Sequence, residues 1–131
     1  DIYIGQFKSS KLDGTGTYFF ANGDKYVGEW SAGKPMGSGS YTYSSGDKYV
    51  GHLKNGKPHG YGTYIWTKGD KYVGSWKFGK KDGKGVYTYF DGDKYAGKFK
   101  KGKRHGYGEI TYNNGSIDKG MWKNGKIKKT N

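Results

Sequence analysis

The chain has 131 residues, about one domain, and is rich in glycine (26 residues) and aromatic residues (18%). A hydrophobic share of 31% is too small for a conventional aliphatic core, whereas so many aromatic rings are not typical of a disordered chain. The absence of cysteine excludes disulfides and thiol chemistry, and the formal net charge of +13 favours anionic partners without specifying them.

The chain is organised by a repeat of 23 residues. The octapeptide GDKYVGEW begins at Gly23, and close copies of it begin at Gly46, Gly69 and Gly92. Counted from the tyrosine of this motif, the units start at Tyr3, Tyr26, Tyr49, Tyr72 and Tyr95, and a degenerate half unit starts at Asp118. Because the period is kept without an insertion, residues 1–131 are predicted to form a single array of repeats.

Each unit begins with a predicted strand. In the second unit Tyr26, Gly28 and Trp30 alternate with a period of two, so they share one face of an extended segment. The following segment, Gly33-Lys34-Pro35-Met36, has the composition of a turn. We call this predicted connection the inner turn of the unit.

A second strand and a second turn complete the unit. Gly37, Gly39, Tyr41 and Tyr43 again share one face. The segments that follow in successive units, NGD, SGD, KGD and DGD, are typical of β-hairpin connections and form the outer turns. A helix is disfavoured, because the glycines of each unit would cost about 1 kcal/mol apiece relative to alanine.

These patterns predict an all-β fold in which tandem 23-residue β-hairpin repeats form an elongated, twisted antiparallel sheet, an open repeat array. On the aromatic face, the glycines leave bare backbone over which rings can lie. An isolated hairpin is only marginally stable, so each hairpin is expected to depend on its neighbours. We therefore expect an aromatic ribbon in place of an aliphatic core.

The repeat resembles the MORN repeat (membrane occupation and recognition nexus). The resemblance rests on Tyr-x-Gly-x-Trp/Phe followed by Gly-Lys-x-x-Gly-x-Gly, as in YVGHLKNGKPHGYGTY from Tyr49 to Tyr64, and it covers the five units and the half unit. It implies consecutive antiparallel hairpins with a groove. It also implies a non-catalytic scaffold, because catalysis in enzymes with such repeats belongs to an attached domain. Two positions depart from the pattern, Ser10 in the first turn and Asp118 in the last unit, which leaves three explanations open for the ends: fraying, capping by a partner, or a cut from a longer array.

The aromatic face is the first candidate binding surface. Tyrosine and tryptophan rings can pack with one edge and offer the other to an extended segment or an amphipathic helix of a protein partner. The alternative is that the rings only stabilise the sheet. The expected contact residues, taken from the central repeats, are Tyr49, Tyr64, Trp66, Tyr72, Trp76, Tyr87 and Tyr89.

A row of basic residues is the second candidate surface. Lysine recurs at the inner turn of every unit and would form a stripe along one long edge of the sheet. Such a stripe suits anionic phospholipid headgroups, although solvated lysines that prevent sheet-to-sheet pairing are a simpler explanation. The residues expected to bind anionic lipid are Lys34, Lys57, Lys80, Lys103 and Arg104.

Neither a catalytic site nor a metal site is expected. Each outer turn brings one aspartate, such as Asp24, whereas calcium prefers six to eight oxygens, and Gly-Asp has ordinary hairpin-turn chemistry. His59 and His105 occupy one repeat position two units apart, which places them about 20 Å from each other and too far apart to share a metal. Because no nucleophile–base pair or cofactor motif is visible, we expect no enzyme activity and no cofactor.

The expected function is that of a scaffold for a protein partner, and peripheral binding to an anionic phospholipid membrane is the alternative. Open edges of the terminal strands would also allow homo-oligomers to form. Single-stranded nucleic acid is a weaker alternative, because the aromatic residues follow the structural lattice and no nucleic-acid motif is present. We expect a cytoplasmic location, at the cytoskeleton or the membrane cortex.

Overall fold

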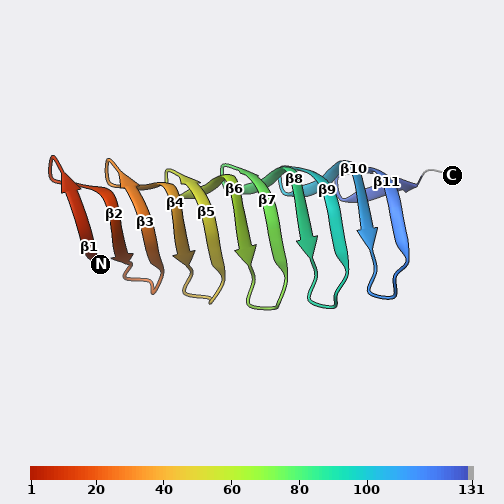
Figure 1. The fold of residues 1–131 in the computed structure, drawn as a ribbon, viewed down its shortest axis with the longest axis horizontal. Helices are drawn as coiled ribbons and strands as arrows, with labels where there is room; N and C mark the ends of the chain where they lie inside the picture. The colour runs from red at the N-terminus through yellow and green to blue at the C-terminus, as the bar shows by residue number, and fades with distance from the viewer. Residues whose placement is uncertain (130–131) are drawn as a thin grey trace.

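The computed structural model describes residues 1–129, which fold into one twelve-stranded antiparallel sheet (Figure 1). Each strand pairs with its neighbours in sequence, and the two chain ends lie at opposite ends of the elongated array. This part of the chain contains no helix, and hence none that could cross a membrane. The strands are β1 (Ile2–Lys8), β2 (Lys11–Phe19), β3 (Lys25–Ser31), β4 (Lys34–Thr42), β5 (Lys48–Lys54), β6 (Lys57–Ile65), β7 (Lys71–Lys77), β8 (Lys80–Thr88), β9 (Lys94–Lys100), β10 (Lys103–Thr111), β11 (Ile117–Lys123) and β12 (Lys126–Lys129).

This architecture confirms the predicted open array of hairpins. Each full unit supplies two strands, such as β3 and β4 for the second unit, and an outer turn leads to the next unit. The outer turns lie in a row along the lower margin of Figure 1. In the first of them the Gly23 amide donates a hydrogen bond to the Phe20 carbonyl at 3.1 Å, and Gly23 has a φ of 96°. The glycine of the NGD motif thus takes the backbone conformation that the turn requires.

The inner turns differ from the sequence prediction. The prediction placed the turn at residues 33–36, but β4 begins at Lys34, and Pro35 pairs with Trp30. The turn consists of Ala32 and Gly33, with φ angles of 51° and 83°. Positive φ at both central residues is the property of a type I′ hairpin turn, which matches the right-handed twist of the strands.

A bulge bends each hairpin. In the second unit Gly28 pairs with Gly39 and Trp30 pairs with Pro35, so that residue 29 of β3 lies opposite residues 36–38 of β4. The register shifts at the corresponding place in the other full units, whereas the pairing between successive units is regular. Figure 1 shows the resulting bend near its upper margin, where the strands turn away from their course.

The first tyrosine of each unit lies over paired glycines at this bend. Tyr49 has no exposed surface, and a Cβ added at Gly62 would lie 2.1 Å from its hydroxyl oxygen. The hydroxyl donates a hydrogen bond to the His52 carbonyl at 2.7 Å, so the ring is buried without leaving a polar atom unsatisfied. The prediction that rings lie over bare backbone is confirmed here. The same placement is found for Tyr26, Tyr72 and Tyr95.

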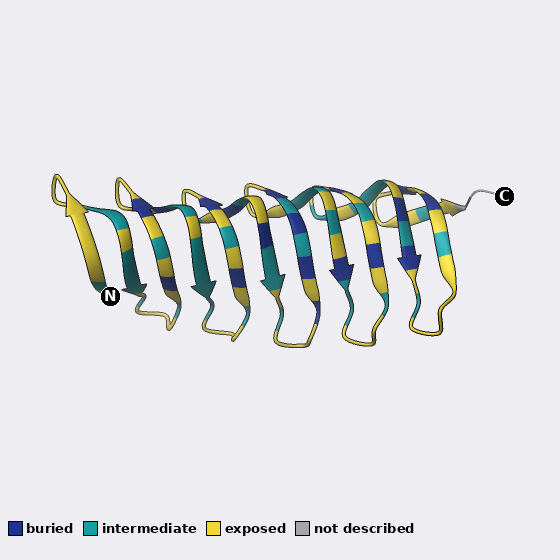
Figure 2. Cartoon of the chain, in the orientation of Figure 1, coloured by how far each residue is buried: buried dark blue, intermediate teal, exposed yellow. Residues whose placement is uncertain are grey.

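The large residue four positions after this tyrosine joins successive units. The ring centroid of Trp76 lies 5.0 Å from that of Tyr72 in its own unit and 5.6 Å from that of Tyr49 in the preceding unit, both edge to face. The Trp76 indole nitrogen also donates to the Gly62 carbonyl at 3.1 Å. Figure 2 shows the outcome as bands of buried residues that alternate with exposed ones along the strands. In β1, the equivalent Phe7 is 62% exposed, because no described hairpin precedes it.

Candidate functional site

The bend brings the two limbs of each hairpin toward each other and leaves a trough between them. By limb we mean the part of the hairpin on one side of the bend. Tyr64 and Trp66 lie on the limb next to the outer turns, and Trp76 and Lys81 lie on the limb next to the inner turns. The ring centroids of Tyr64 and Trp76 lie 6.0 Å apart, and the Lys81 Nζ lies 5.5 Å from the centre of the Trp66 ring. These four residues line a hollow of about 420 Å³. We call the surface formed by them and by their equivalents in other units the aromatic trough.

The rings of the outer limb form a continuous ladder along the array. The ladder alternates between the repeat positions of Tyr64 and Trp66, with successive ring centroids 4.4 to 5.7 Å apart and interplanar angles of 32 to 46°. Such tilted contacts are favourable beyond the area that they bury. The ladder stops where Ile110 takes the next tyrosine position. Its members are Tyr18, Phe20, Tyr41, Tyr43, Tyr64, Trp66, Tyr87 and Tyr89.

The seven predicted contact residues lie on this one face, but four of them are buried. Tyr49 and Tyr72 have no exposed surface, and Trp76 and Tyr87 are 7% and 9% exposed. These four rings have little surface to offer a partner in this conformation. The other three are only partly buried and keep an edge in the aromatic trough: they are Tyr64, Trp66 and Tyr89.

Two cations occupy the aromatic trough in the later units. The Lys81 Nζ lies 4.9 Å from the centre of the Tyr87 ring, and burial together with the nearby Arg104 charge lowers the pKa of Lys81. The Arg104 guanidinium lies 4.8 Å from the centre of the Trp122 ring and donates a hydrogen bond to the Tyr89 hydroxyl. The sequence placed Arg104 in the basic row of the inner turns, but its side chain points into the trough. Cation–π contacts of this kind stabilise the junction between units.

The outer-turn aspartates fasten each hairpin to the next one. The Asp70 carboxylate accepts hydrogen bonds from the Tyr87 hydroxyl at 2.6 Å and the Phe90 amide at 2.9 Å, and it lies 3.2 Å from the Lys68 Nζ. Burial by itself raises the pKa of Asp70, but these hydrogen bonds and the lysine charge outweigh it and lower the pKa below its ordinary value. The sequence pattern indicated only turn chemistry for these aspartates, so this role was not predicted. The same pair of hydrogen bonds is made by Asp1, Asp24 and Asp47.

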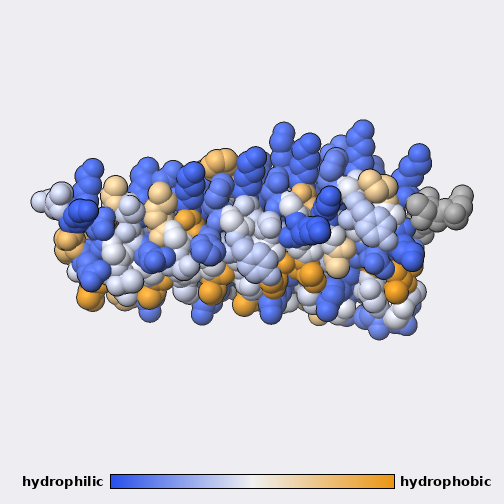
Figure 3. All heavy atoms as spheres, turned by 45° about the horizontal axis from the view of Figure 1, so that its top comes forward, coloured by the Kyte–Doolittle hydropathy of each residue, from blue (hydrophilic) through white to orange (hydrophobic). Residues whose placement is uncertain are grey.

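The lysines of the inner turns lie along one long edge of the array. Figure 3 shows hydrophilic side chains that project along its upper margin. In the third unit Lys57 pairs across the hairpin with Lys54, and the next two hairpins repeat this pairing of lysine with lysine. Like charges directly opposite each other lower the stability of a sheet, so the positive charge of this edge does not stabilise the fold. The predicted lysines on this edge, all exposed, are Lys34, Lys57, Lys80 and Lys103.

The histidines and acidic residues form no metal cluster within residues 1–129, where no three of these side chains are placed to hold an ion. The His59 Nδ1 instead accepts a hydrogen bond from the Phe78 amide in the next inner turn at 3.2 Å. Asp82 occupies the same repeat position one unit later and accepts from the Lys101 amide at 3.3 Å. This repeat position therefore links neighbouring inner turns.

Comparison with known protein families matches the MORN repeat to residues 3–25, 26–48, 49–71, 72–94 and 95–117. These are the five units defined by the tyrosine period, and each contains two strands and an outer turn. A comparison with curated proteins finds no match. The MORN repeat is generally a non-catalytic module that suggests a role in protein or membrane interaction. Because the five consecutive matches cover most of its length, the chain belongs to the MORN repeat family.

Proposed function

We propose that the chain is a non-catalytic scaffold that binds a protein partner lengthwise in the aromatic trough. The proposal rests on the row of ring edges that stay partly exposed in every full unit, at the repeat position of Trp66. Successive units are about 10 Å apart, since each adds two strands about 4.8 Å wide. An extended segment or an amphipathic helix laid along the array would meet one ring edge per unit. Every ring in the row offers apolar contact, and the tyrosine and tryptophan rings also offer a hydrogen-bonding group.

A paired substitution tests this function. Tyr43→Ala with Trp66→Ala removes two partly exposed rings and leaves the fully buried Tyr49 in place. Proteins captured from native extract by this variant are compared with those captured by the wild-type chain. The control is Phe90→Ala, which removes a ring that is 74% exposed on an outer turn outside the trough. We expect the double variant to lose the captured proteins and the control to keep them; a double variant that retains every partner refutes the proposal.

The lysine edge supports a second candidate function, peripheral binding to an anionic phospholipid membrane. Flotation with liposomes of anionic or neutral phospholipid would test it. Replacement of the four edge lysines by glutamate should abolish flotation with anionic liposomes. Binding should also fade with salt, because the screening length falls from about 10 Å at 0.1 M to about 3 Å at 1 M. Flotation that resists both the substitutions and the salt would exclude an electrostatic membrane contact. The substituted residues are Lys34, Lys57, Lys80 and Lys103.

A further inference from the structure

The face opposite the aromatic trough carries hollows at the bulges. A hollow of about 440 Å³ lies in the first two units, and one of about 790 Å³ lies in the fourth and fifth units. Seven lining residues of the first hollow have counterparts at the same repeat positions in the second. The chemistry differs, because Glu29 in the first hollow corresponds to Lys98 in the second, and Ser31 corresponds to Lys100. We call the hollow of the fourth and fifth units the basic hollow.

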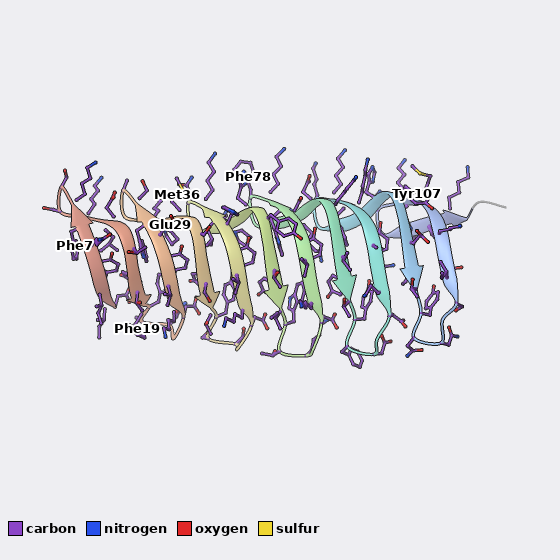
Figure 4. The ribbon with its side chains drawn as sticks, viewed as in Figure 1. Phe7, Phe19, Glu29, Met36, Phe78 and Tyr107 are labelled. Atoms are coloured by element: carbon purple, nitrogen blue, oxygen red, sulfur yellow. The ribbon has the colours of Figure 1, made fainter. Side chains whose placement is uncertain are left out.

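In the first hollow the protein supplies its own acceptor to a backbone amide of the bulge. The Glu29 carboxylate, labelled in Figure 4, accepts a hydrogen bond from the Ser38 amide at 2.5 Å. It lies over Gly37, where a Cβ would collide with it. In the first unit the Gln6 Oε1 accepts from the Thr15 amide at 3.0 Å in the same manner. The bulge thus forms a place for one side-chain oxygen over a glycine.

The basic hollow has no such acceptor. Lys98 stands where the second unit has Glu29, and within residues 1–129 no side chain accepts a hydrogen bond from the amide of Tyr107, the counterpart of Ser38. One carboxylate, that of Asp82, is among the described residues that line the hollow, and it is engaged with a backbone amide. Five lysines also line the basic hollow: Lys77, Lys80, Lys98, Lys100 and Lys101.

An apolar shelf adjoins the basic hollow and shares Lys98 with it. Val86 and Ala96 lie in the floor of the shelf, and the exposed rings of Tyr61 and Tyr107 stand at its sides, around a volume of about 560 Å³. Ala96 occupies a repeat position at which the three preceding units carry valine, so the floor is lowest here. In Figure 4 Tyr107 lies on the same side of the array as Glu29, several units away.

We propose that the basic hollow and the apolar shelf together bind an acidic segment of a partner protein. A carboxylate of the partner takes the place over Gly106 that Glu29 takes in the second unit, with the Tyr107 amide as donor and Lys98 and Lys100 as counter-charges. An apolar side chain of the same segment rests on the shelf. The concave shape and the amide donor favour a single peptide over a flat bilayer, which would meet the projecting lysines instead. Lys80 and Lys101 of the inner turns border both this hollow and the trough, but Lys98, Lys100 and Gly106 line the basic hollow and not the trough. The proposal is therefore independent of the proposed function.

The test measures binding of the labelled peptide Glu-Glu-Phe-Glu-Glu to the whole chain by fluorescence anisotropy. Lys98→Glu gives the fifth unit the carboxylate that Glu29 supplies in the second, so the site is filled from within. We expect it to weaken binding about tenfold or more. Lys94→Glu is the control, because it makes the same charge change on β9 next to the outer turn. It should weaken binding about twofold or less, since that charge is screened from the hollow.

The outcomes separate the proposal from its rivals. Equal weakening by Lys98→Glu and Lys94→Glu would mean that net charge alone attracts the peptide, and it would overturn the proposal, as would full affinity of Lys98→Glu. Displacement of the peptide by anionic phospholipid vesicles as effective as that by unlabelled peptide would assign the hollow to a membrane instead. The peptide with alanine in place of phenylalanine should bind about fivefold more weakly if the shelf is used; equal affinity contradicts that part. Trp66→Ala should leave peptide affinity unchanged, which keeps this test separate from that of the trough.

Discussion

The contact between one tyrosine ring and one glycine is the unit from which this core is built. Tyr49 lies over Gly62, and its hydroxyl is satisfied by the His52 carbonyl. Burial of a ring of this size contributes about 2 kcal/mol or more. Gly62 is absent from the residues with positive φ, so glycine is required there for space and not for backbone freedom.

Gly62→Ala should therefore lower the free energy of unfolding by about 3 kcal/mol, because the added methyl group would displace the Tyr49 ring. Gly102→Ala is the control for backbone conformation: no atom lies within 4 Å of a Cβ there, but the φ of 86° disfavours alanine. We expect the control to cost about 1–2 kcal/mol. Denaturant unfolding measures both variants. A greater loss of stability in Gly102→Ala than in Gly62→Ala would mean that backbone conformation matters more than space for the tyrosine ring, contrary to our interpretation.

Asp70 shows how one side chain can depend on the repeat that follows it. Asp70→Ala removes the acceptor of the buried Tyr87 hydroxyl and of the Phe90 amide, and should lower the free energy of unfolding by about 2–4 kcal/mol. Asp93→Ala is the matched control. Among residues 1–129, the Asp93 carboxylate accepts a hydrogen bond only from the Asn113 amide, at 2.9 Å, because the next unit has isoleucine at the tyrosine position; the loss of this carboxylate should cost about 1 kcal/mol. Thermal or denaturant unfolding measures the loss of stability in each variant, and equal losses would contradict a contribution from the hydrogen bond between Tyr87 and Asp70.

At the scale of the element, the inner turns hold one conformation with different residues. Asn55 and Asn124 have φ angles of 51° and 50° at the first central position of the turn. Phe78 and Lys101 occupy the same position with φ angles of 46° and 50°. Asparagine tolerates the left-handed region better than either residue, because its short side chain can hydrogen-bond locally. The turns with phenylalanine or lysine at this position are therefore less stable than the same turn with asparagine would be.

Lys101→Asn should raise the free energy of unfolding by about 0.5–1 kcal/mol, because the side chain at this position is exposed and only the backbone preference changes. The reciprocal substitution Asn55→Lys should lower it by a similar amount. The two variants are compared by denaturant unfolding at moderate salt, which limits the effect of the added or removed charge. Changes of the same sign in both variants would show that charge and not the turn governs the result.

The bulge is the element that creates both the aromatic trough and the hollows on the opposite face. Residue 29 lies opposite residues 36–38, and Gly37 in that segment has a φ of 80°. On one face, the bend brings Trp30 to within 5.3 Å of Tyr18, centroid to centroid, and so lines the trough. On the other face, the same extra residues form the floor of a hollow. A hairpin with a regular register would lack this bend and would have neither the trough nor the hollow.

In the whole molecule, the stability of each unit depends on its contacts with the neighbouring units. Every strand of the described part pairs only with the strands next to it in sequence, so no strand pairing joins distant units directly. Such an array resembles a one-dimensional chain of coupled units. Within the described residues, β1 and β12 each have one unpaired side, and pairing of these edges into homo-oligomers stays a prediction.

The tyrosines also set how the whole array responds to alkaline pH. Burial raises the pKa of the Tyr95 hydroxyl from 10.0 to about 12, and burial with the charge of Glu29 raises that of Tyr26 to about 12. A group with a raised folded-state pKa stabilises the fold fully below its unfolded-state pKa and loses this contribution as the pH rises through the folded value. The free energy of unfolding should therefore fall between pH 10 and about pH 12.

Denaturant unfolding across this pH range measures the effect, and Tyr95→Phe provides the control. The variant lacks the hydrogen bond from the Tyr95 hydroxyl to the Lys98 carbonyl, 3.0 Å long, so it should be less stable than the wild type at neutral pH. Its stability should nevertheless fall less steeply above pH 10, because one titrating group is gone. An identical slope in the two proteins would show that the fall has another origin.

Much of the fold could be predicted from the sequence, because its determinants are local. Alternation with a period of two places Tyr26 and Trp30 on one face whatever surrounds them. The repeat of 23 residues then orders the hairpins along the array. The inner turn was misplaced because Gly-Lys-Pro has the composition of a turn, whereas Pro35 lies inside β4. The role of the aspartates was missed because it needs the register between units, which pairs Asp70 with a tyrosine of the next hairpin.

The strands, their order and the face that carries the rings follow from patterns within the sequence. Which rings are core and which are surface depends on the folded array: Tyr49 and Trp66 lie on the same face, yet Tyr49 is fully buried and Trp66 lines the trough. The folded array also places Lys98 and Glu29, at one repeat position, in equivalent hollows. The physical reason is the bulge. Its bend depends on how two strands pair, and neither strand specifies that pairing alone.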